Sequence, residues 1–330
     1  MKSKLLVLVL ILFLFPFSLS AQFFHSENFH LSIEPTFSYS RGVLNESIYH
    51  SQETSKKISL LEWERKVWMC GLNIDGSYRK FHLKSGFEMS IPTSSGEMRD
   101  SDWLNYSDYS MKTTYSVGTN YADRNFDSFL SFSYDFEPAA GLSLSPEAQI
   151  QYSFDSFHRE KGAEGWYGHS DYSSDGKNHW WYEEEAAHFP SVNPETGKTR
   201  KLAGIDYYRH SLYLWTGLYL AFRFSRFHAS LSFLISPFTY LSAEDRHHTA
   251  GDDNVFHEIQ EDYFTSYKLG LSLSYEISEY FDLTLNGSLL IVGDIKGELY
   301  EGWTENKFQA TGGGSQSGTI RLGCRIKVSG

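Results

Sequence analysis

Apolar and polar residues alternate with a period of two along most of the chain beyond residue 21. Successive side chains of a β-strand point to opposite faces, so this alternation predicts strands with one apolar and one polar face. The clearest rows lie at 126–136, 142–154, 212–224, 267–277 and 320–328.

Strands with one apolar and one polar face fit either a soluble β-sandwich or a membrane β-barrel. The apolar rows here are long, whereas strands of soluble proteins average about 5–6 residues in total. The polar face carries Asp, Glu, Lys and Arg, which a sandwich core could not bury cheaply. Short turns alternate with long polar loops, as in outer-membrane barrels. The pattern therefore predicts an all-β fold, an antiparallel transmembrane β-barrel with extended extracellular loops.

We predict ten strands for this barrel. The fourth and fifth segments of the alternating pattern adjoin one another and are expected to form one strand, because bacterial single-chain barrels have even strand numbers. The segments lie at 28–45, 56–74, 77–94, 111–126, 127–136, 140–159, 204–225, 226–243, 261–277, 280–296 and 317–329.

The connections between these strands are of two kinds. Short turns are expected at Asn73–Gly76, Glu137–Pro138 and Ser278–Glu279, which contain turn-forming residues. The longest loop, residues 160–203, is rich in Gly, Ser, Trp, His and acidic residues. Loops of such length are usually functional, so we expect this one to form part of the rim.

The first 21 residues are typical of a secretory signal peptide. Lys2 and Lys4 precede an apolar run, and small residues follow it up to Ala21. The alternative, a membrane anchor, is disfavoured because a spanning helix needs about 20 apolar residues. Cleavage after Ala21 would leave residues 22–330 as a single barrel domain and would change the net charge from −12 to −14.

The negative charge limits the partners of the mature chain. Nucleic-acid binding needs a positively charged surface, so we expect no nucleic-acid partner. A negatively charged rim would instead attract cationic partners, and the barrel wall would face outer-membrane lipid.

Two short motifs near the ends of predicted strands could carry chemistry. Asp100 and Asp102 lie on the same side of an extended chain, and two carboxyl groups held close together resist double ionisation. Asp245 and His247 share the same spacing, so the acid can orient the imidazole, which can then take a proton from water. Both motifs also occur in solvated loops, and the alternative of no chemistry stays open.

Three stretches of the chain resemble the omptin family of outer-membrane proteases. Residues 46–63 look like the family's first hairpin, residues 98–103 match its Asp-x-Asp-Trp motif, and residues 245–247 match its Asp-x-His motif. The resemblance implies a ten-stranded barrel in the outer membrane, with an active-site groove at the extracellular end. It also implies an endopeptidase that acts on peptide or protein substrates.

The same resemblance implies a role for each motif residue. His247 would be the general base and Asp245 its orienting partner. Asp100 and Asp102 would position and polarise the water that attacks the peptide carbonyl. This chemistry uses no metal and no cofactor.

The resemblance extends in part to the pocket for a basic substrate side chain. Glu46 coincides with a family acidic residue that lines this pocket. The family's second pocket acid corresponds to Ala243, and the adjacent Glu244 is the candidate to replace it. Strict alternation, however, would point Glu244 away from the pocket.

In the strand that leads to Asp245, the alternation of inward and outward side chains must shift by one residue. The apolar residues of 227–235 have odd numbers, as do Asp245 and His247, so an unbroken strand would direct the Asp–His pair outward. We therefore predict a β-bulge between Pro237 and Glu244.

The sequence also allows functions other than that of a protease. His247, His248 and His257 do not have the spacing of a standard zinc site, so no metal is predicted. A non-catalytic barrel, either an adhesin or a structural protein, remains the main alternative. A small-solute channel is disfavoured, because open porin channels have roughly 16–18 strands.

Overall fold

The computed structural model describes residues 29–50, 53, 55–105, 108–167, 170–172, 178–180, 187–189, 191–192, 199–200, 204–248, 253–302 and 307–329. The predicted signal peptide, residues 1–21, lies outside the described residues. No helix in the described part of the chain is long and apolar enough to cross a membrane.

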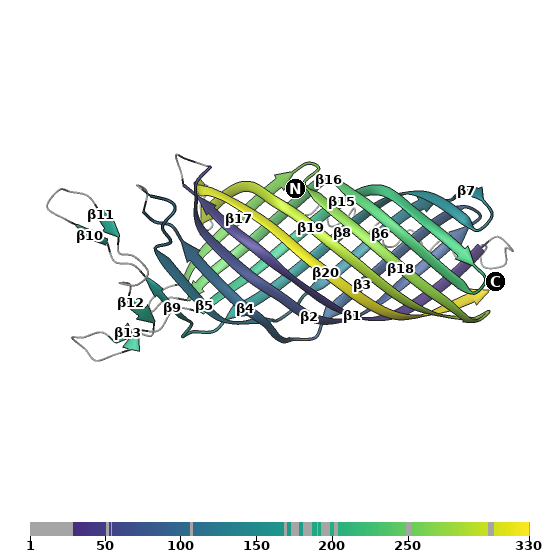
Figure 1. The fold of residues 1–330 in the computed structure, drawn as a ribbon, viewed down its shortest axis with the longest axis horizontal. Coiled ribbons are helices and arrows are strands. Elements are labelled where there is room, and N and C mark those ends of the chain that lie inside the picture. The colour runs from purple at the N-terminus through teal and green to yellow at the C-terminus, as the bar shows by residue number, and fades with distance from the viewer. Residues whose placement is uncertain are drawn as a thin grey trace.

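Within the described residues, ten antiparallel strands form a closed barrel (Figure 1). The ring closes where β1 pairs with both β2 and β20. Three of the ten strands consist of two consecutive elements each. The barrel elements are β1 (Phe29–Tyr49), β2 (Lys57–Tyr78), β3 with β4 (Phe81–Ser90, Thr93–Asp102), β5 with β6 (Thr114–Ala122, Phe126–Tyr134), β8 (Leu142–Arg159), β15 (Gly204–Phe224), β16 (Phe227–His248), β17 with β18 (Asp253–Asp262, Ser266–Ser278), β19 (Phe281–Glu301) and β20 (Lys307–Ser329).

The remaining strands are short and lie beyond the two ends of the barrel (Figure 1). β7 (Phe136–Ala139) pairs with β8 at the end where the turns are tight. The predicted rim loop at 160–203 contains the others, and β9 continues the sheet by pairing with β5. These elements are β9 (Glu164–Tyr167), β10 (Ser170–Tyr172), β11 (Asn178–Trp180), β12 (Ala187–Phe189), β13 (Ser191–Val192) and β14 (Thr199–Arg200).

The predicted ten strands are confirmed, but several of them extend beyond their predicted bounds. The turn predicted at Glu137–Pro138 is wrong, because both residues lie within β7. The segments at 111–126 and 127–136 form one strand of the ring, as β5 and β6. The turn predicted at Asn73–Gly76 is wrong, because β2 continues to Tyr78. Asp75 points into the polar interior and pairs with Lys84 at 3.8 Å, so its polarity reflects the barrel lumen rather than a turn.

Large apolar side chains cover the outside of the barrel at the tight-turn end. They line the outward faces of 81–91, 214–224 and 267–277, among others. A Lys or Arg at the centre of a bilayer costs about 2–4 kcal/mol in such a barrel, which accounts for an uncharged belt. Beyond this belt, outward positions of β2, β4 and β16 carry Glu64, Arg99 and Arg246 instead. The membrane-spanning belt therefore occupies only the tight-turn half of the strands.

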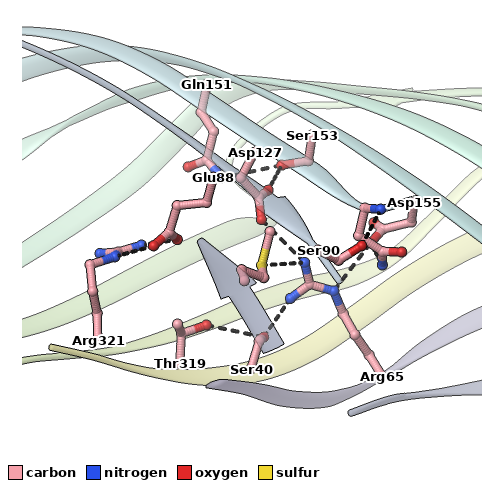
Figure 2. Close-up of polar contacts among 12 residues, drawn as sticks. Ser40, Arg65, Glu88, Ser90, Asp127, Gln151, Ser153, Asp155, Thr319 and Arg321 are labelled. Atoms are coloured by element: carbon pink, nitrogen blue, oxygen red, sulfur yellow. Dashed lines mark hydrogen bonds and ion pairs between the residues drawn. The ribbon is translucent and has the colours of Figure 1, made fainter. Parts of the chain in front are cut away.

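Ion pairs fill much of the interior at the level of this belt. Figure 2 shows Arg65 between two carboxylates, with its Nη2 3.1 Å from Asp127 and its Nε 3.1 Å from Asp155. Glu88 pairs with Arg321 beside them. Because each of these charges has an opposite charge or a hydrogen bond, they can lie inside the barrel at low cost.

An apolar layer separates these ion pairs from the long-loop end. On β2, the inward side chains follow one another as Arg65, Trp63 and Leu61. Trp63 is fully buried and stacks on Tyr207, with ring centroids 5.3 Å apart, and on Phe157 at 6.2 Å. This layer forms the floor of the interior space at the long-loop end.

Candidate active site

A change of phase in β16 directs Asp245 into the barrel. Ile235 pairs with Thr216 and Phe238 with Leu214, so Ser236 and Pro237 together oppose one residue of β15. The extra residue switches the buried positions of β16 from even to odd numbers. The predicted bulge is confirmed, and its register shift lies at Ser236–Pro237, at the start of the predicted interval.

Asp245 and His247 form a hydrogen-bonded dyad beyond this bulge. Nε2 of His247 lies 2.6 Å from Oδ2 of Asp245, which is almost fully buried. Phe256, the cross-strand partner of Asp245, packs edge-on against the His247 ring with centroids 5.8 Å apart. A carboxylate can only accept, so Nε2 carries the donated hydrogen and Nδ1 of the neutral ring is the free base.

Asp100 and Asp102 lie on β4, at the opposite wall of the same space. Asp100 is the cross-strand partner of Leu61 on one side and of Ser116 on the other. The hydroxyl groups of Ser116 and Ser59 hydrogen-bond to Asp100 and Asp102, respectively. Asp100 and Asp102 therefore lie next to the apolar layer around Trp63, on its long-loop side.

The two walls are close enough to influence each other's ionisation. Burial raises the pKa of Asp100, while the charge of His247 acts against this rise and that of Asp245 adds to it. Burial and the charge of Asp100 raise the pKa of Asp102 to about 7. Burial alone would lower the pKa of His247, but the charge and hydrogen bond of Asp245 outweigh it and raise that pKa.

Two further carboxyl groups, Glu46 on β1 and Glu258 on β17, meet beside the dyad. Glu46 is 0 % exposed and Glu258 is 1 % exposed. Their carboxyl groups lie close enough that each acts on the pKa of the other. Oε2 of Glu258 accepts a hydrogen bond of 2.5 Å from Gln260. Neither oxygen of Glu46 has a hydrogen-bond partner among the described residues.

Burial and neighbouring charge determine the ionisation of this glutamate pair. Burial raises the pKa of Glu258 to about 7, and Arg209 opposes the rise. Burial, with the charges of Asp245 and Glu258, raises the pKa of Glu46 well above its usual value. Strongly shifted carboxyl groups inside one polar space are typical of catalytic and binding sites.

Comparison with known proteins bears on this arrangement. The model of the Omptin family matches residues 27–155, which contain Glu46 and the Asp100–Asp102 pair. The crystal structure of the outer membrane protease OmpT from Escherichia coli superposes with a TM-score of 0.75 at 17 % sequence identity. The superposition covers 92 % of this chain and 99 % of OmpT. The resemblance to the omptin family is confirmed.

Other solved barrels are less similar to this omptin-like chain. The translocator domain of the autotransporter NalP from Neisseria meningitidis gives a TM-score of 0.35 at 8 % identity, over 98 % of this chain and 96 % of that one. OprG from Pseudomonas aeruginosa gives 0.32 at 9 % identity, over 92 % and 98 %. These scores are too low to carry an argument. Among curated proteins, none matches the sequence.

The structure does not bring Glu244 into the omptin-like site. Glu244 lies on the opposite face of β16 from Asp245, where it pairs with Arg246 at 2.8 Å and with His257 at 3.8 Å. Regular alternation after the bulge makes this outward direction unavoidable. The prediction that Glu244 replaces the acid missing at Ala243 is therefore wrong.

Glu258 occupies the space that Glu244 cannot reach, and the sequence analysis missed it. Glu258 is the cross-strand partner of Ala243, so its carboxyl group enters the same row from the next strand. In the sequence, Glu258 is a glutamate among the alternating residues of 253–262. It can be assigned to the site only when the pairing of this strand with β16 is known.

Proposed function

We propose that this protein is an outer-membrane endopeptidase that hydrolyses peptide bonds with an activated water. The observation that carries the proposal is the 2.6 Å contact between His247 and Asp245, facing the Asp100–Asp102 pair across the same polar space. Similarity to the omptins supports an outer-membrane protease.

In the proposed reaction, a water lies between the two walls of the site. Nδ1 of His247 removes a proton as the water oxygen attacks the peptide carbonyl carbon, and Asp245 stabilises the imidazolium that forms. The ionised member of the Asp100–Asp102 pair accepts the other hydrogen of the water and fixes its direction. The imidazolium then donates its proton to the departing amine, so the chain is cut and His247 is neutral again.

A basic substrate side chain is proposed to enter beside the dyad, at Glu46 and Glu258. Both carboxyl groups are almost fully buried, and burial raises the pKa of each, which favours the form that carries a proton. A lysine or arginine side chain can replace that proton and supply charge-assisted hydrogen bonds to both groups. We therefore expect cleavage next to basic residues, with cationic peptides or proteins as substrates.

The site is proposed to face the outside of the cell. Outer-membrane barrels have short periplasmic turns and longer extracellular loops. The dyad lies at the long-loop end, because His247 pairs with Ile205 just after the loop at 160–203. Export would use residues 1–21 as a signal peptide that is removed after Ala21. The belt of apolar side chains would contact outer-membrane lipid.

The alternative is a non-catalytic barrel, an adhesin or structural protein. It gives no reason for a buried, unpaired pair of carboxyl groups beside an Asp–His dyad, because an uncompensated buried charge is costly. Cleavage of dibasic and scrambled peptides by refolded protein separates the two functions. The wild type should cut the dibasic peptides, and Asp100→Ala and His247→Ala should not. Equal inertness of all three proteins would contradict a protease.

A further inference from the structure

Arg159, the last residue of β8, is buried beside the candidate active site. Only 3 % of its surface is exposed. Its aliphatic stem lies over Gly118, where an added Cβ would lie 3.0 Å from Cδ and 3.1 Å from Cγ of Arg159. The absence of a side chain at residue 118 therefore makes room for this arginine.

The guanidinium group of Arg159 is connected to Asp100 through one hydroxyl group. Its Nη1 donates a hydrogen bond of 2.9 Å to Oγ of Ser116, which is itself almost fully buried. Ser116 is the cross-strand partner of Asp100 and hydrogen-bonds to its carboxylate. Arg159, Ser116 and Asp100 thus form a chain across β8, β5 and β4.

The charge of Arg159 acts on both walls of the site. It opposes the rise in the pKa of Asp100 that burial causes, and it interacts with Asp245 on the opposite wall. A guanidinium group stays protonated at any physiological pH, so this positive charge is permanent. Among the described residues, the positive charge that acts on Asp102 is that of His247, which is not permanent, and Ser59 supplies a hydrogen bond.

We propose that Arg159, acting through Ser116, is a positioning residue that keeps Asp100 ionised and directed at the attacking water, which leaves Asp102 as the member of the pair that holds a proton. This inference rests on the proposed peptide hydrolysis for its role in catalysis. The division of protons between the two aspartates does not depend on that activity and can be measured without it.

Several charged groups face Asp100. Negative charge comes from Asp102 on its own strand, Asp245 on β16 and Glu46 on β1. Positive charge comes from Arg159 and from His247 when it is protonated. Since like charges surround Asp100 on three strands, removal of Arg159 takes away the permanent positive charge that opposes them.

The test is an infrared titration of refolded protein, in which the carboxylic acid band of Asp100 is isolated by subtracting the spectrum of an Asp100→Asn version. Arg159→Gln should raise the midpoint of Asp100 by about one pH unit, as loss of a nearby unit charge predicts. Ser116→Ala should raise it less, and Arg159→Lys should restore most of the wild-type midpoint. Arg65→Gln removes an equally buried arginine away from the site and should leave the midpoint unchanged.

Activity gives the second readout. In Arg159→Gln, the acidic limb of the kcat/KM profile should move to higher pH by the same amount as the infrared midpoint. An unchanged Asp100 midpoint in Arg159→Gln would overturn the inference, even if the wild type cleaves peptides. A shifted midpoint in a protein that cleaves nothing would support the inference about Asp100 and would contradict the proposed function alone.

Discussion

Glu258 on β17 lies directly opposite Ala243 on β16, in the same row of the sheet. Side chains of directly opposite residues share one space, with Cβ atoms about 4.5–5.5 Å apart. A carboxyl group from either strand would therefore reach the same point beside Asp245. The pocket here combines this glutamate with Glu46 from β1, which is separated from Glu258 by most of the sequence but adjoins it in the barrel.

Glu258→Gln is expected to weaken recognition of basic side chains. It should lower kcat/KM for peptides with Lys or Arg about tenfold to a hundredfold, mainly through KM, because a charge-assisted hydrogen bond contributes about 1.5–3 kcal/mol. Peptides with norleucine at the same place should be cut equally by both proteins. Steady-state kinetics on matched peptides measures the difference.

The matched control for this prediction is Glu244→Gln. Glu244 is nearby in sequence but pairs with Arg246 on the outer face, so its loss should change kcat/KM less than twofold. A larger effect of Glu244→Gln than of Glu258→Gln would show that the pocket has been assigned to the wrong glutamate.

Binding of basic peptides is expected to depend on pH. The pKa of Glu258 is raised to about 7, so Glu258 loses its proton as the pH rises through that value. KM for lysine peptides should therefore fall between about pH 6 and pH 8. An unchanged KM over this range would contradict a role for ionised Glu258 in binding, and Glu258→Gln should remove the dependence.

The same raised pKa predicts the direction of a stability change. A carboxyl group whose pKa is higher in the folded than in the unfolded state favours folding when it is protonated. Its contribution is complete below the unfolded value of about 4.3 and is lost as the pH rises through about 7. Denaturant unfolding at pH 6 and pH 8 should show a smaller loss of stability in Glu258→Gln than in the wild type.

Loss of the dyad is expected to reduce kcat rather than binding. His247→Ala should lower kcat by about 10²–10⁴, the usual contribution of a general base, with KM little changed. His248→Ala is the control, because His248 pairs with Asp206 and Asp253, each at 3.0 Å, on the other face of β16. Retained activity in His247→Ala, or equal losses in both variants, would remove His247 from the mechanism.

Arg65→Ala is expected to destabilise the barrel. It leaves Asp127 and Asp155 without their partner inside the lumen, and breaking a buried ion pair costs about 3–5 kcal/mol. Arg223→Ala, which removes an exposed arginine 3.9 Å from Glu276, should cost less than about 1 kcal/mol. Unfolding of both variants in urea, followed by gel mobility of the folded barrel, compares them.

The strand pattern and the two candidate motifs could be read from the sequence because both depend on local spacing. The alternation predicted the strands. It also showed that an unbroken strand would direct Asp245 outward, and the bulge was predicted from this conflict. The turn at Asn73–Gly76 was misread because a polar residue inside a barrel and a polar residue in a turn look alike in one dimension. Asp75 is distinguished by its contacts with Lys84 and His82 inside the barrel.

By itself, the sequence determined the class of fold, the number of strands and the residues of the two motifs. These features can be read within single strands, because side chains alternate between the two faces of a strand with a period of two. Only the tertiary structure decided that Glu258 rather than Glu244 joins Glu46, and that Arg159 reaches Asp100 through Ser116. These contacts join strands far apart in the chain, and they depend on sheet register and on the closure of the barrel.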